Sequence, residues 1–258
     1  MVRKIRSKKR KLLVDGSVFV YRIASGIEEP IQWEDDIWTL HSDLKLGKQL
    51  LDNAIGHYTK ILNCNEVIIA MDDKDNFRKS IFPEYKSHRK KVRKPIVVKP
   101  LKEYITKNYK TICYKSLEGD DVLGILATSK EYKDNCIILS SDKDMRTIPA
   151  IHHFIHDDST EIVDEQTADY NFMYQTLVGD LTDNFGGCPN VGAVKAQRVL
   201  ANINKKLPEM WKAVIAEYKR AELDEKYALT QARLARILRA TDWDSQKQKP
   251  ILWLPPSV

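Results

Sequence analysis

Short apolar runs rich in Ile and Val recur along the first two thirds of the chain, and helical patterns separate them. The runs occupy residues 11–15, 66–71, 111–117, 135–139 and 151–155. Their length and composition are typical of buried parallel strands. Apolar residues at helical spacing occupy residues 44–62, 101–109 and 122–130. This alternation predicts an α/β fold with a central, mostly parallel sheet flanked by helices.

The pattern changes after about residue 164. Residues 165–178 are predicted to be helical, and a turn rich in Gly, Asp and Asn follows at 179–192. Further helices are predicted at 211–220 and 227–239, before a Pro-containing extended tail that starts at residue 245. We therefore predict an α/β core over residues 1–164 and an all-helical part over residues 165–258. Trp33 and Trp38 are expected to pack against helices.

Composition narrows the classes of function. The 258 residues include 42 Lys and Arg against 36 Asp and Glu, and the formal net charge of +6 suggests a polyanionic partner. The four cysteines are far apart and form no C-x-x-C pair, which argues against a zinc site. No apolar run has the length of a membrane span, so we expect a cytoplasmic protein without a membrane partner.

Acidic residues follow four of the predicted strands. They are Asp15, Asp72, Glu118, Asp120, Asp121, Asp142 and Asp144. Ligands of open parallel sheets bind outside the carboxyl ends of the strands, so these acids should meet at one rim. Each acid alone is better explained as a helix cap than as a metal ligand. Acids after four successive strands instead favour a Mg²⁺ or Mn²⁺ site, suited to two-metal hydrolysis of a phosphodiester. Asp180 and Asp183 either join this rim or belong to an Asx-type turn.

A basic segment follows Asp72. Between residues 78 and 94 there are eight Lys or Arg and one acid, Glu84, with Phe and Tyr interleaved. Such a mixture suits a nucleic-acid strand, because the charges meet phosphates and the rings can stack on bases. A solvated loop is the alternative. The position beside an acidic rim favours phosphate binding, and Lys86 and Arg89 are spaced to share a helix face.

These motifs, in this order, resemble the flap-endonuclease (5′ nuclease) superfamily, and within it the phage-encoded 5′→3′ exonucleases. The residues that carry the resemblance are Leu-Val-Asp15-Gly-Ser, Met-Asp72-Asp, Pro-Glu-Tyr85-Lys86-Ser-His-Arg89, Leu-Glu118-Gly-Asp120-Asp121, Ser-Ser-Asp142-Lys-Asp144 and Gly179-Asp180-Leu-Thr-Asp183-Asn184, with the turn between Gly187 and Gly192. The resemblance implies a PIN-like 5′ nuclease core, a basic arch segment at about residues 77–100, and a helix–hairpin–helix-type turn in the helical part.

The resemblance also implies ligands and roles. Two Mg²⁺ ions, for which Mn²⁺ can substitute, would be held by Asp15, Asp72, Glu118 and Asp120 and by Asp142, Asp144, Asp180 and Asp183, with Asp121 close by. Lys86 and Arg89 would be catalytic. DNA would be bound by Arg78, Tyr85, Lys90, Lys91, Gly187, Gly192 and Lys195, where Arg78 either contacts phosphate or braces the arch.

The turn departs from the family pattern at Cys188, Asn190 and Ala193. Asn tolerates the left-handed conformation, so the turn itself is expected to form. The departures weaken the case for a K⁺ ion there more than the case for DNA contact.

The implied activity is 5′→3′ exonuclease action on double-stranded DNA with release of 5′-phosphorylated products, and removal of RNA from RNA–DNA hybrids is a further activity to test. A 5′ flap endonuclease is the alternative, although the short segment at 78–100 fits trimming of duplex ends better than threading. A PIN-type ribonuclease would share the acidic rim, and a non-catalytic DNA-binding protein would use the turn alone. We expect a monomer, in the host cytoplasm if phage-encoded, with replication proteins as candidate partners.

Overall fold

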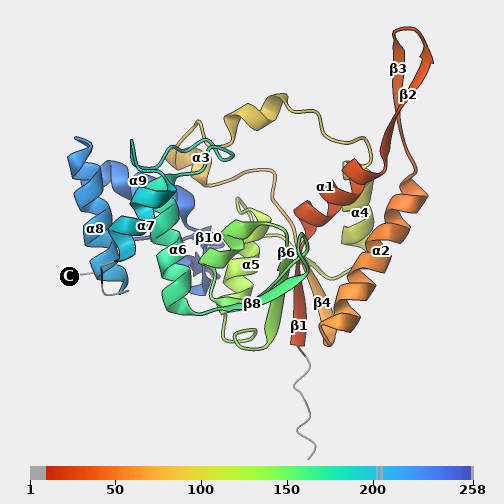
Figure 1. Ribbon diagram of the computed structural model, residues 1–258. Helices are drawn as coiled ribbons and strands as arrows, with labels where there is room; N and C mark the ends of the chain where they lie inside the picture. Colours follow the sequence, from red (N-terminus) through yellow and green to blue (C-terminus); the bar gives the residue numbers. More distant parts are fainter. Residues whose placement is uncertain (1–9, 202, 204–205, 257–258) are drawn as a thin grey trace, which may run out of the picture.

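A six-stranded sheet forms the centre of the molecule, with the strand order β5-β4-β1-β6-β7-β8 (Figure 1). The computed structural model describes residues 10–201, 203 and 206–256. The strands are β1 (Arg10–Asp15), β4 (Cys64–Ala70), β5 (Thr111–Ile112), β6 (Cys136–Ser140), β7 (Ala150–Phe154) and β8 (Ser159–Val163). All neighbours pair in parallel except β7 and β8, which are antiparallel. The predicted α/β fold with a mostly parallel sheet is confirmed.

Helices cover both faces of the sheet. Leu12 and Val14 of β1 lie in an apolar cluster with α1 (Gly16–Gly26), α2 (Leu44–Ile61) and α4 (Val98–Asn108). Leu13 lies in the cluster on the opposite face, where α5 (Gly119–Thr128) packs. Because both faces are buried, the strands appear in the sequence as continuous apolar runs rather than as alternating patterns.

The start of α1 brings two strand ends together. Gly16 directly follows β1, and a Cβ atom there would lie 2.5 Å from the sulfur of Met71 and 2.6 Å from Ile69. Only glycine allows this close approach of α1 to β4. The approach sets Asp15 and Asp72 at the same edge of the sheet.

The helical part has its own apolar cluster. It consists of α6 (Glu165–Val178), α7 (Ala193–Ala201), α8 (Leu207–Arg220) and α9 (Glu225–Ala235). Trp253 of the C-terminal tail packs edge-on against Phe172 and Trp211 inside this cluster. Ile237 and Leu238, however, join the cluster beside the sheet. The chain thus returns to the α/β core after α9, and the division at residue 164 stays a prediction.

Three short elements occupy the region around the predicted tail. They are η3 (Ala240–Asp242), β9 (Trp243–Asp244) and β10 (Lys249–Pro250). Residues 251 to 256 form neither helix nor strand.

Two predicted elements were too long. The strand expected at 111–117 is only the two residues of β5, and the chain turns at residues 115–116, where Ser116 adopts a left-handed conformation with φ of 60°. The helix expected at 227–239 ends at Ala235, because Arg236 is extended. No helix within the described ranges is long and apolar enough to cross a membrane.

The prediction for Trp33 and Trp38 was wrong. Both lie on a two-stranded hairpin, β2 (Glu28–Glu34) and β3 (Ile37–Ser42), that projects from the junction of α1 and α2 (Figure 1). Their side chains are exposed rather than packed against helices.

Candidate active site

One cavity of about 280 Å³ lies at the carboxyl ends of the central strands. Eight of the nine acids expected at the metals line it: Asp15, Asp72, Glu118, Asp120, Asp142, Asp144, Asp180 and Asp183. The first six follow β1, β4, β5 and β6, and the last two come from the turn after α6. The rim expected from the strand ends therefore exists, and the turn at 180–183 reaches it.

Asp15 is held by two hydrogen bonds at the end of β1. One carboxylate oxygen accepts from the backbone N–H of Val18 at 3.1 Å and so caps α1, and the other accepts from the hydroxyl of Ser140 at 2.8 Å. The residue is 1% exposed. Burial, with a contribution from the charges of Asp72 and Asp142, raises the pKa of Asp15 to about 6, although the hydrogen bonds from Val18 and Ser140 act in the opposite direction.

Two other acids have strongly raised pKa values. Burial raises the pKa of Asp120 well above its usual range, and the neighbouring Asp15 and Asp142 add to the shift. Burial and the charges of Asp142 and Asp180 raise the pKa of Asp144 to about 7. Crowded carboxylates of this kind disfavour one another's charged forms, and a cation between them would reverse that effect.

The basic segment meets this rim. Lys86 donates from Nζ to Glu118 at 2.5 Å, and the same nitrogen lies 3.3 Å from Asp183. Arg89 donates from Nη2 to Asp183 at 2.8 Å. Lys86 adopts a left-handed conformation with φ of 53°, which is uncommon for a residue with a side chain and starts the 3₁₀ helix η1 (Ser87–Lys91). The predicted pair Lys86 and Arg89 thus reaches the carboxylates.

The Lys86–Glu118 contact balances the charge of both groups. Burial alone would raise the pKa of Glu118, but Lys86 and Arg78 lower it to a net value of about 2. Burial likewise opposes the charge of Lys86, yet Glu118 and Asp183 raise its pKa overall. Both side chains therefore stay charged at neutral pH.

Asp121 differs from the expectation, because it does not line the cavity. It is fully buried behind the rim and accepts two hydrogen bonds of 2.7 Å from the guanidinium of Arg78. It also accepts from the backbone N–H of Leu238 at 3.1 Å. Arg78 is 2% exposed and donates to the backbone carbonyls of Leu234 and Arg236. The pair joins the basic segment, α5 and the end of α9, so the geometry favours the bracing role for Arg78 over phosphate contact.

Tyr85 is also more enclosed than a base-stacking ring would be. Its ring lies in the apolar cluster of the helical part, and its hydroxyl lies 2.8 Å from Asp183 and 3.0 Å from Glu118. This side chain is placed to orient two carboxylates rather than to stack on DNA. Of the other residues expected to bind DNA, Lys91 is exposed, and the side chain of Lys90 lies outside the described set.

The turn from Gly187 to Gly192 forms as expected from the sequence. Asn190 adopts the left-handed conformation, with φ of 60°. Gly187 is also left-handed, and its N–H donates to the side chain of Gln231 at 2.9 Å, so this amide is engaged inside the protein. Gly192 is exposed at the start of α7, and Lys195 on that helix pairs with Glu217 at 3.2 Å. Gly192 and Lys195 are the exposed members of this group.

Three further polar residues contact the carboxylates but were missed from the sequence. The hydroxyl of Ser17 donates to Asp72, and Lys102 lies 3.4 Å from the same carboxylate. Gln175 of α6 donates to Asp144 at 2.9 Å. Ser17 could have been found from its place two residues after Asp15, whereas Lys102 and Gln175 become neighbours only through the fold.

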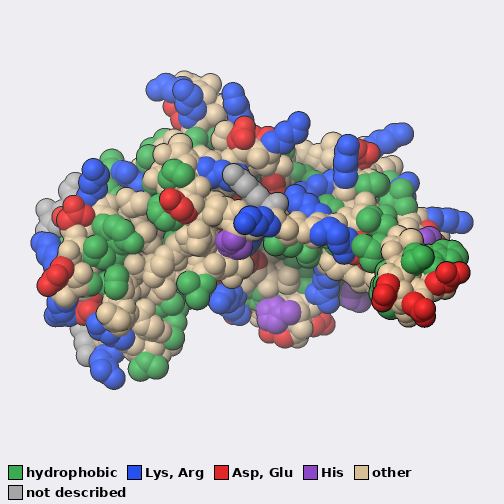
Figure 2. Space-filling model, turned by 90° about the horizontal axis from the view of Figure 1, so that it is seen from above, with side chains coloured by type: hydrophobic (Ala, Val, Ile, Leu, Met, Phe, Trp, Pro, Cys, Tyr) green, Lys and Arg blue, Asp and Glu red, His purple; other side chains and the backbone are tan. Residues whose placement is uncertain are grey.

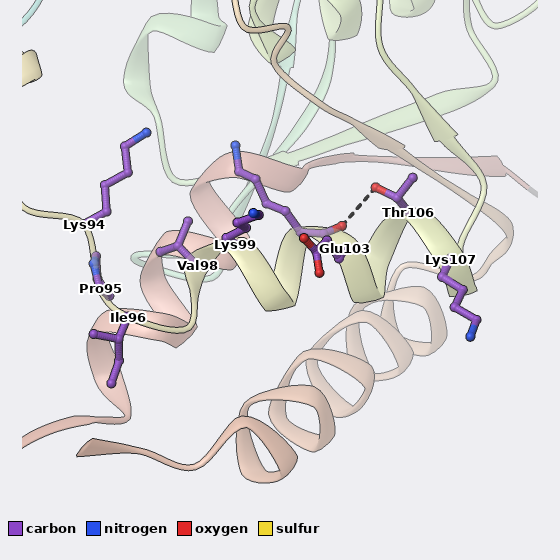
Figure 3. Close-up of a pocket in the computed structure, with 9 residues that line it drawn as sticks. Lys94, Pro95, Ile96, Val98, Lys99, Glu103, Thr106 and Lys107 are labelled. Atoms are coloured by element: carbon purple, nitrogen blue, oxygen red, sulfur yellow. Dashed lines mark hydrogen bonds between the residues drawn. The ribbon is translucent and has the colours of Figure 1, made fainter. Parts of the chain in front are cut away.

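Lys102 connects the rim to a groove along α4. Figure 3 draws this groove, with Lys94, Lys99 and Glu103 among the labelled residues. The groove has a volume of about 680 Å³ and is lined by residues that include Lys94, Lys99, Lys102 and Lys107, with Glu103 as its acid. Lys and Arg side chains are also spread across the face seen in Figure 2. A cationic surface thus begins beside Asp72 and runs away from it, as a polyanion would require.

The carboxylates fit hard divalent cations by their chemistry. Their oxygens are the ligands that Mg²⁺ and Mn²⁺ prefer. Within the part of the chain that the structure describes, no group of three His, Cys, Asp or Glu side chains already stands at metal-binding geometry. Three of these carboxylates already have a side-chain partner: Asp72 accepts from Ser17, Glu118 from Lys86 and Asp183 from Arg89. A metal ion would have to replace these partners.

Comparison with protein families agrees with this geometry. The family model described as 5′-3′ exonuclease, N-terminal resolvase-like domain, matches residues 10–173. An exodeoxyribonuclease of Enterobacteria phage T3 is 28% identical over 95% of this chain and 93% of its own length. An exonuclease of Escherichia phage T7 is 27% identical over the same shares of the two chains.

Solved structures share the fold. A flap endonuclease of bacteriophage T5, in a complex with DNA and metal ions, covers 90% of this chain and 89% of its own, with a TM-score of 0.67 at 15% identity. A second T5 structure, with zinc ions bound to a 5′-exonuclease, has a TM-score of 0.66 at 16% identity and covers 88% and 89% of the two chains. At this identity the likeness concerns the fold.

Proposed function

Because the chain belongs to the family of 5′-3′ exonucleases, we propose that it hydrolyses duplex DNA from 5′ ends with the help of two Mg²⁺ ions. The activity is that of a nuclease dependent on divalent metal. The observation that carries the proposal is the convergence of eight carboxylates with the side chains of Lys86 and Arg89 on one cavity. The phage relatives named exonuclease support action at ends.

The carboxylates would hold the metal ions in two groups. Asp15, Asp72, Glu118 and Asp120 would bind the first ion, and Asp142, Asp144, Asp180 and Asp183 the second. When bound, such ions activate a water molecule and stabilise the leaving oxygen of a phosphodiester. The raised pKa values of Asp15, Asp120 and Asp144 support this assignment, because a cation is what such crowded acids lack.

Lys86 and Arg89 would hold the scissile phosphate. Lys86 spans from Glu118, in the first group, to Asp183, in the second, so its ammonium lies where a phosphate between the groups would sit. Arg89 is more exposed and would contact the phosphate from the side of the basic segment. Both cations would stabilise the charge that develops on the phosphate oxygens.

The flanking surfaces would position the duplex. The lysines of the α4 groove would follow one backbone away from Asp72, and Gly192 with Lys195 would meet the duplex at the start of α7. The assignment of K⁺ to the turn stays a prediction. RNA–DNA hybrids fit the same chemistry, since the reaction takes place at the phosphate.

Cleavage of a 5′-labelled blunt duplex tests the proposal. The wild-type chain should release short 5′-labelled products with Mg²⁺ or Mn²⁺ and none with chelator. Asp142→Asn should lower the rate by at least about 100-fold, because it removes a charged ligand. Asp134→Asn is the matched control, since Asp134 is exposed and already left-handed, a conformation that Asn accepts. Full activity of Asp142→Asn would refute the metal assignment.

Substrate preference needs a second comparison. A blunt duplex, a 5′ flap and an RNA–DNA hybrid should be cleaved side by side. Faster cleavage of the blunt duplex than of the flap supports an exonuclease that trims duplex ends. A marked preference for the flap would instead make the chain a structure-specific endonuclease.

A further inference from the structure

The hairpin β2–β3 exposes apolar side chains on a part of the molecule that the nuclease site does not use. It forms a separate two-stranded sheet that projects from the body of the molecule (Figure 1). Trp33 is 66% exposed and Trp38 57%, and three further apolar side chains on the hairpin are exposed: Ile31, Ile37 and Leu40. Exposed apolar groups gathered in one place mark interaction surfaces, and an isolated hairpin is marginally stable in water until further strands or a helix cover it. The hairpin is therefore expected to be covered by a partner.

The two strands of the hairpin differ in how their outer edges are protected. β2 contains Pro30, which has no N–H to donate, and begins and ends with glutamates. β3 has the sequence Ile-Trp-Thr-Leu-His-Ser, with neither proline nor an Asp, Glu, Lys or Arg side chain. Proline and charged residues are the usual protection of an edge strand. In the described structure β3 pairs with β2 alone, so its other edge is open to an additional strand.

The hairpin carries a charge opposite to that of the chain as a whole. From residue 28 to residue 43 there are six Asp or Glu and neither Lys nor Arg, although the formal net charge of the chain is +6. Two of these acids are engaged at the base of the hairpin, where Glu28 pairs with Arg93 and Asp43 caps α2, close to Lys45. The other four are exposed and form no ion pair with a described residue: Glu29, Glu34, Asp35 and Asp36. Unpaired acids of this kind favour a basic partner and repel nucleic-acid phosphates.

The unpaired acids lie at both ends of the exposed edge strand. Residues 34–36, at the turn before β3, are all acidic, and Glu29 lies opposite His41 near the other end of β3. Between them, Trp38 and Leu40 point to the same face of the strand, because side chains two residues apart do so. A segment laid beside β3 would therefore meet apolar side chains in its middle and carboxylates at each end.

We propose that β3 is the docking edge for an extended segment of a partner protein, with apolar residues in its middle and Lys or Arg at both ends. The segment adds a third strand to the hairpin, and its backbone pairs with the free N–H and C=O groups of β3. Its apolar side chains cover Trp38 and Leu40, and its basic side chains meet the acids beyond them. The main chain thus gives affinity, and the side chains give specificity.

The charge of the surrounding surface separates this site from the one for nucleic acid. Figure 2 shows acidic and apolar side chains together at the end of the molecule where the hairpin lies, whereas Lys and Arg are spread over the rest of that face. A polyanion is attracted to the Lys and Arg and repelled by the hairpin. A basic protein segment has the opposite preference, so the two ligands bind to different parts of the chain.

Binding of a synthetic peptide to the full chain tests the proposal. The probe has alternating Val and Thr in its middle, two Lys at each end and a fluorescent label, and fluorescence anisotropy measures its dissociation constant. Leu40→Lys should raise this constant by at least about tenfold, because a buried apolar contact becomes a charge that repels the lysines of the peptide. Ile162→Lys is the matched control and should bind like the wild type, since Ile162 is 79% exposed on the edge strand β8 of the central sheet.

Two methylated peptides test strand addition on the unaltered protein, so that no variant has to fold. One carries N-methyl groups on the backbone of its Val residues and the other on its Thr residues. Only every second N–H of an added strand faces β3, and the contact with Trp38 fixes which edge of the peptide does so. One methylated peptide should therefore bind at least about tenfold more weakly than the other. Equal binding of the two would overturn pairing at the edge.

Charge is tested by exchanging acids and bases. A peptide with Glu in place of each Lys should bind at least about tenfold more weakly than the probe. Asp36→Asn should weaken binding of the probe by about two- to fivefold, the effect of one exposed ion pair, whereas Asp134→Asn should not change it. Equal binding of the Glu and Lys peptides, or no binding of the probe to the wild type, overturns the proposal.

Duplex DNA is the competing ligand for the hairpin. If Leu40→Lys changed the affinity for duplex DNA in chelator but not for the peptide, the hairpin would be a DNA-binding element and the proposal would be wrong. None of these measurements involves cleavage, so their outcome does not depend on the proposed nuclease mechanism.

Discussion

Arg78 and Lys86 belong to the same basic segment and both contact carboxylates, but their surroundings differ. The side chains of Arg78 and Asp121 are 3% and 0% exposed and form a bidentate pair. Those of Lys86 and Glu118 are 16% and 18% exposed and line the cavity. Arg78 also borders the cavity, but Asp121 does not, and the guanidinium is held by Asp121 and two backbone carbonyls. The second pair is the more exposed one and can exchange its partner for a metal ion or a phosphate. One run of basic residues thus contains a structural contact and a candidate catalytic one.

Removal of Arg78 has the largest expected effect. Arg78→Ala leaves the buried Asp121 without its guanidinium partner and frees the carbonyls of Leu234 and Arg236. Breaking a buried pair in this way costs about 3–5 kcal/mol of unfolding free energy. Chemical denaturation of both proteins measures the difference.

Two comparisons make this result specific. The unfolding free energy of Arg78→Lys should lie between those of the wild type and Arg78→Ala, because an ammonium keeps the charge but not the two parallel hydrogen bonds. Lys79→Ala, at the exposed neighbouring position, should change stability little. If Arg78→Ala kept wild-type stability and lost only DNA binding, Arg78 would contact phosphate, which is the second role expected from the sequence.

Lys86→Ala should show the opposite pattern. Because Lys86 faces the cavity, its loss should lower the rate of duplex cleavage by about 100- to 1,000-fold, the usual effect of removing one group that stabilises a developing charge. In Mg²⁺ its unfolding free energy should change by less than about 1 kcal/mol, since a metal can balance Glu118 and Asp183. Single-turnover cleavage and denaturation, both in Mg²⁺, separate the two effects.

The same control variant applies here. Lys79→Ala should cleave at the wild-type rate, which would exclude a general effect of charge in the segment. Equal loss of rate in both variants would mean that the segment acts through its overall charge. A large loss of stability in Lys86→Ala would place Lys86 with Arg78 as a structural residue.

Burial explains which parts of the site could be predicted from sequence. The strands were recognised because both faces of the sheet are buried, and the rim followed because parallel strands end at one edge. Asp120 and Asp121, however, are adjacent in sequence, and consecutive residues of a helix point about 100° apart. Asp120 therefore lines the cavity, and Asp121 pairs with Arg78 behind it. Only the three-dimensional packing decides which of the two faces the cavity.

The hairpin was missed for the opposite reason. Residues 28–42 contact no core, so their sequence carries no burial pattern, and their turn residues Asp35 and Asp36 are not a typical hairpin pair. Lys102 and Gln175 were missed because they approach the carboxylates from helices that are distant in sequence. Such neighbours have no signal in a single sequence.

The last prediction concerns pH and again separates the cavity from the buried pair. The pKa of Asp144 is about 7 in the folded chain, well above its usual value of about 4. Between these values the folded state binds more protons than the unfolded state, so stability in chelator should fall as pH rises from about 5 to 7. Asp15, with a pKa of about 6, contributes in the same direction. Glu118, lowered to about 2, is charged in the folded state throughout this range and contributes in the opposite direction only near pH 5, where the unfolded state still binds some protons.

Thermal unfolding between about pH 5 and pH 8, with chelator and with Mg²⁺, measures this dependence. In chelator, Asp144→Asn should reduce the fall of stability with rising pH, because the group that gives up its proton is gone. Asp134→Asn should keep the pH dependence of the wild type. Mg²⁺ should stabilise the wild type increasingly as pH rises, since ionised carboxylates bind the metal and protonated ones do not. Identical profiles for Asp144→Asn and the wild type would mean that Asp144 is already charged at about pH 5. The repulsion among the carboxylates of the cavity would then be balanced by the basic side chains of the protein itself. Lys86 would be the residue to examine, because it contacts both carboxylate groups.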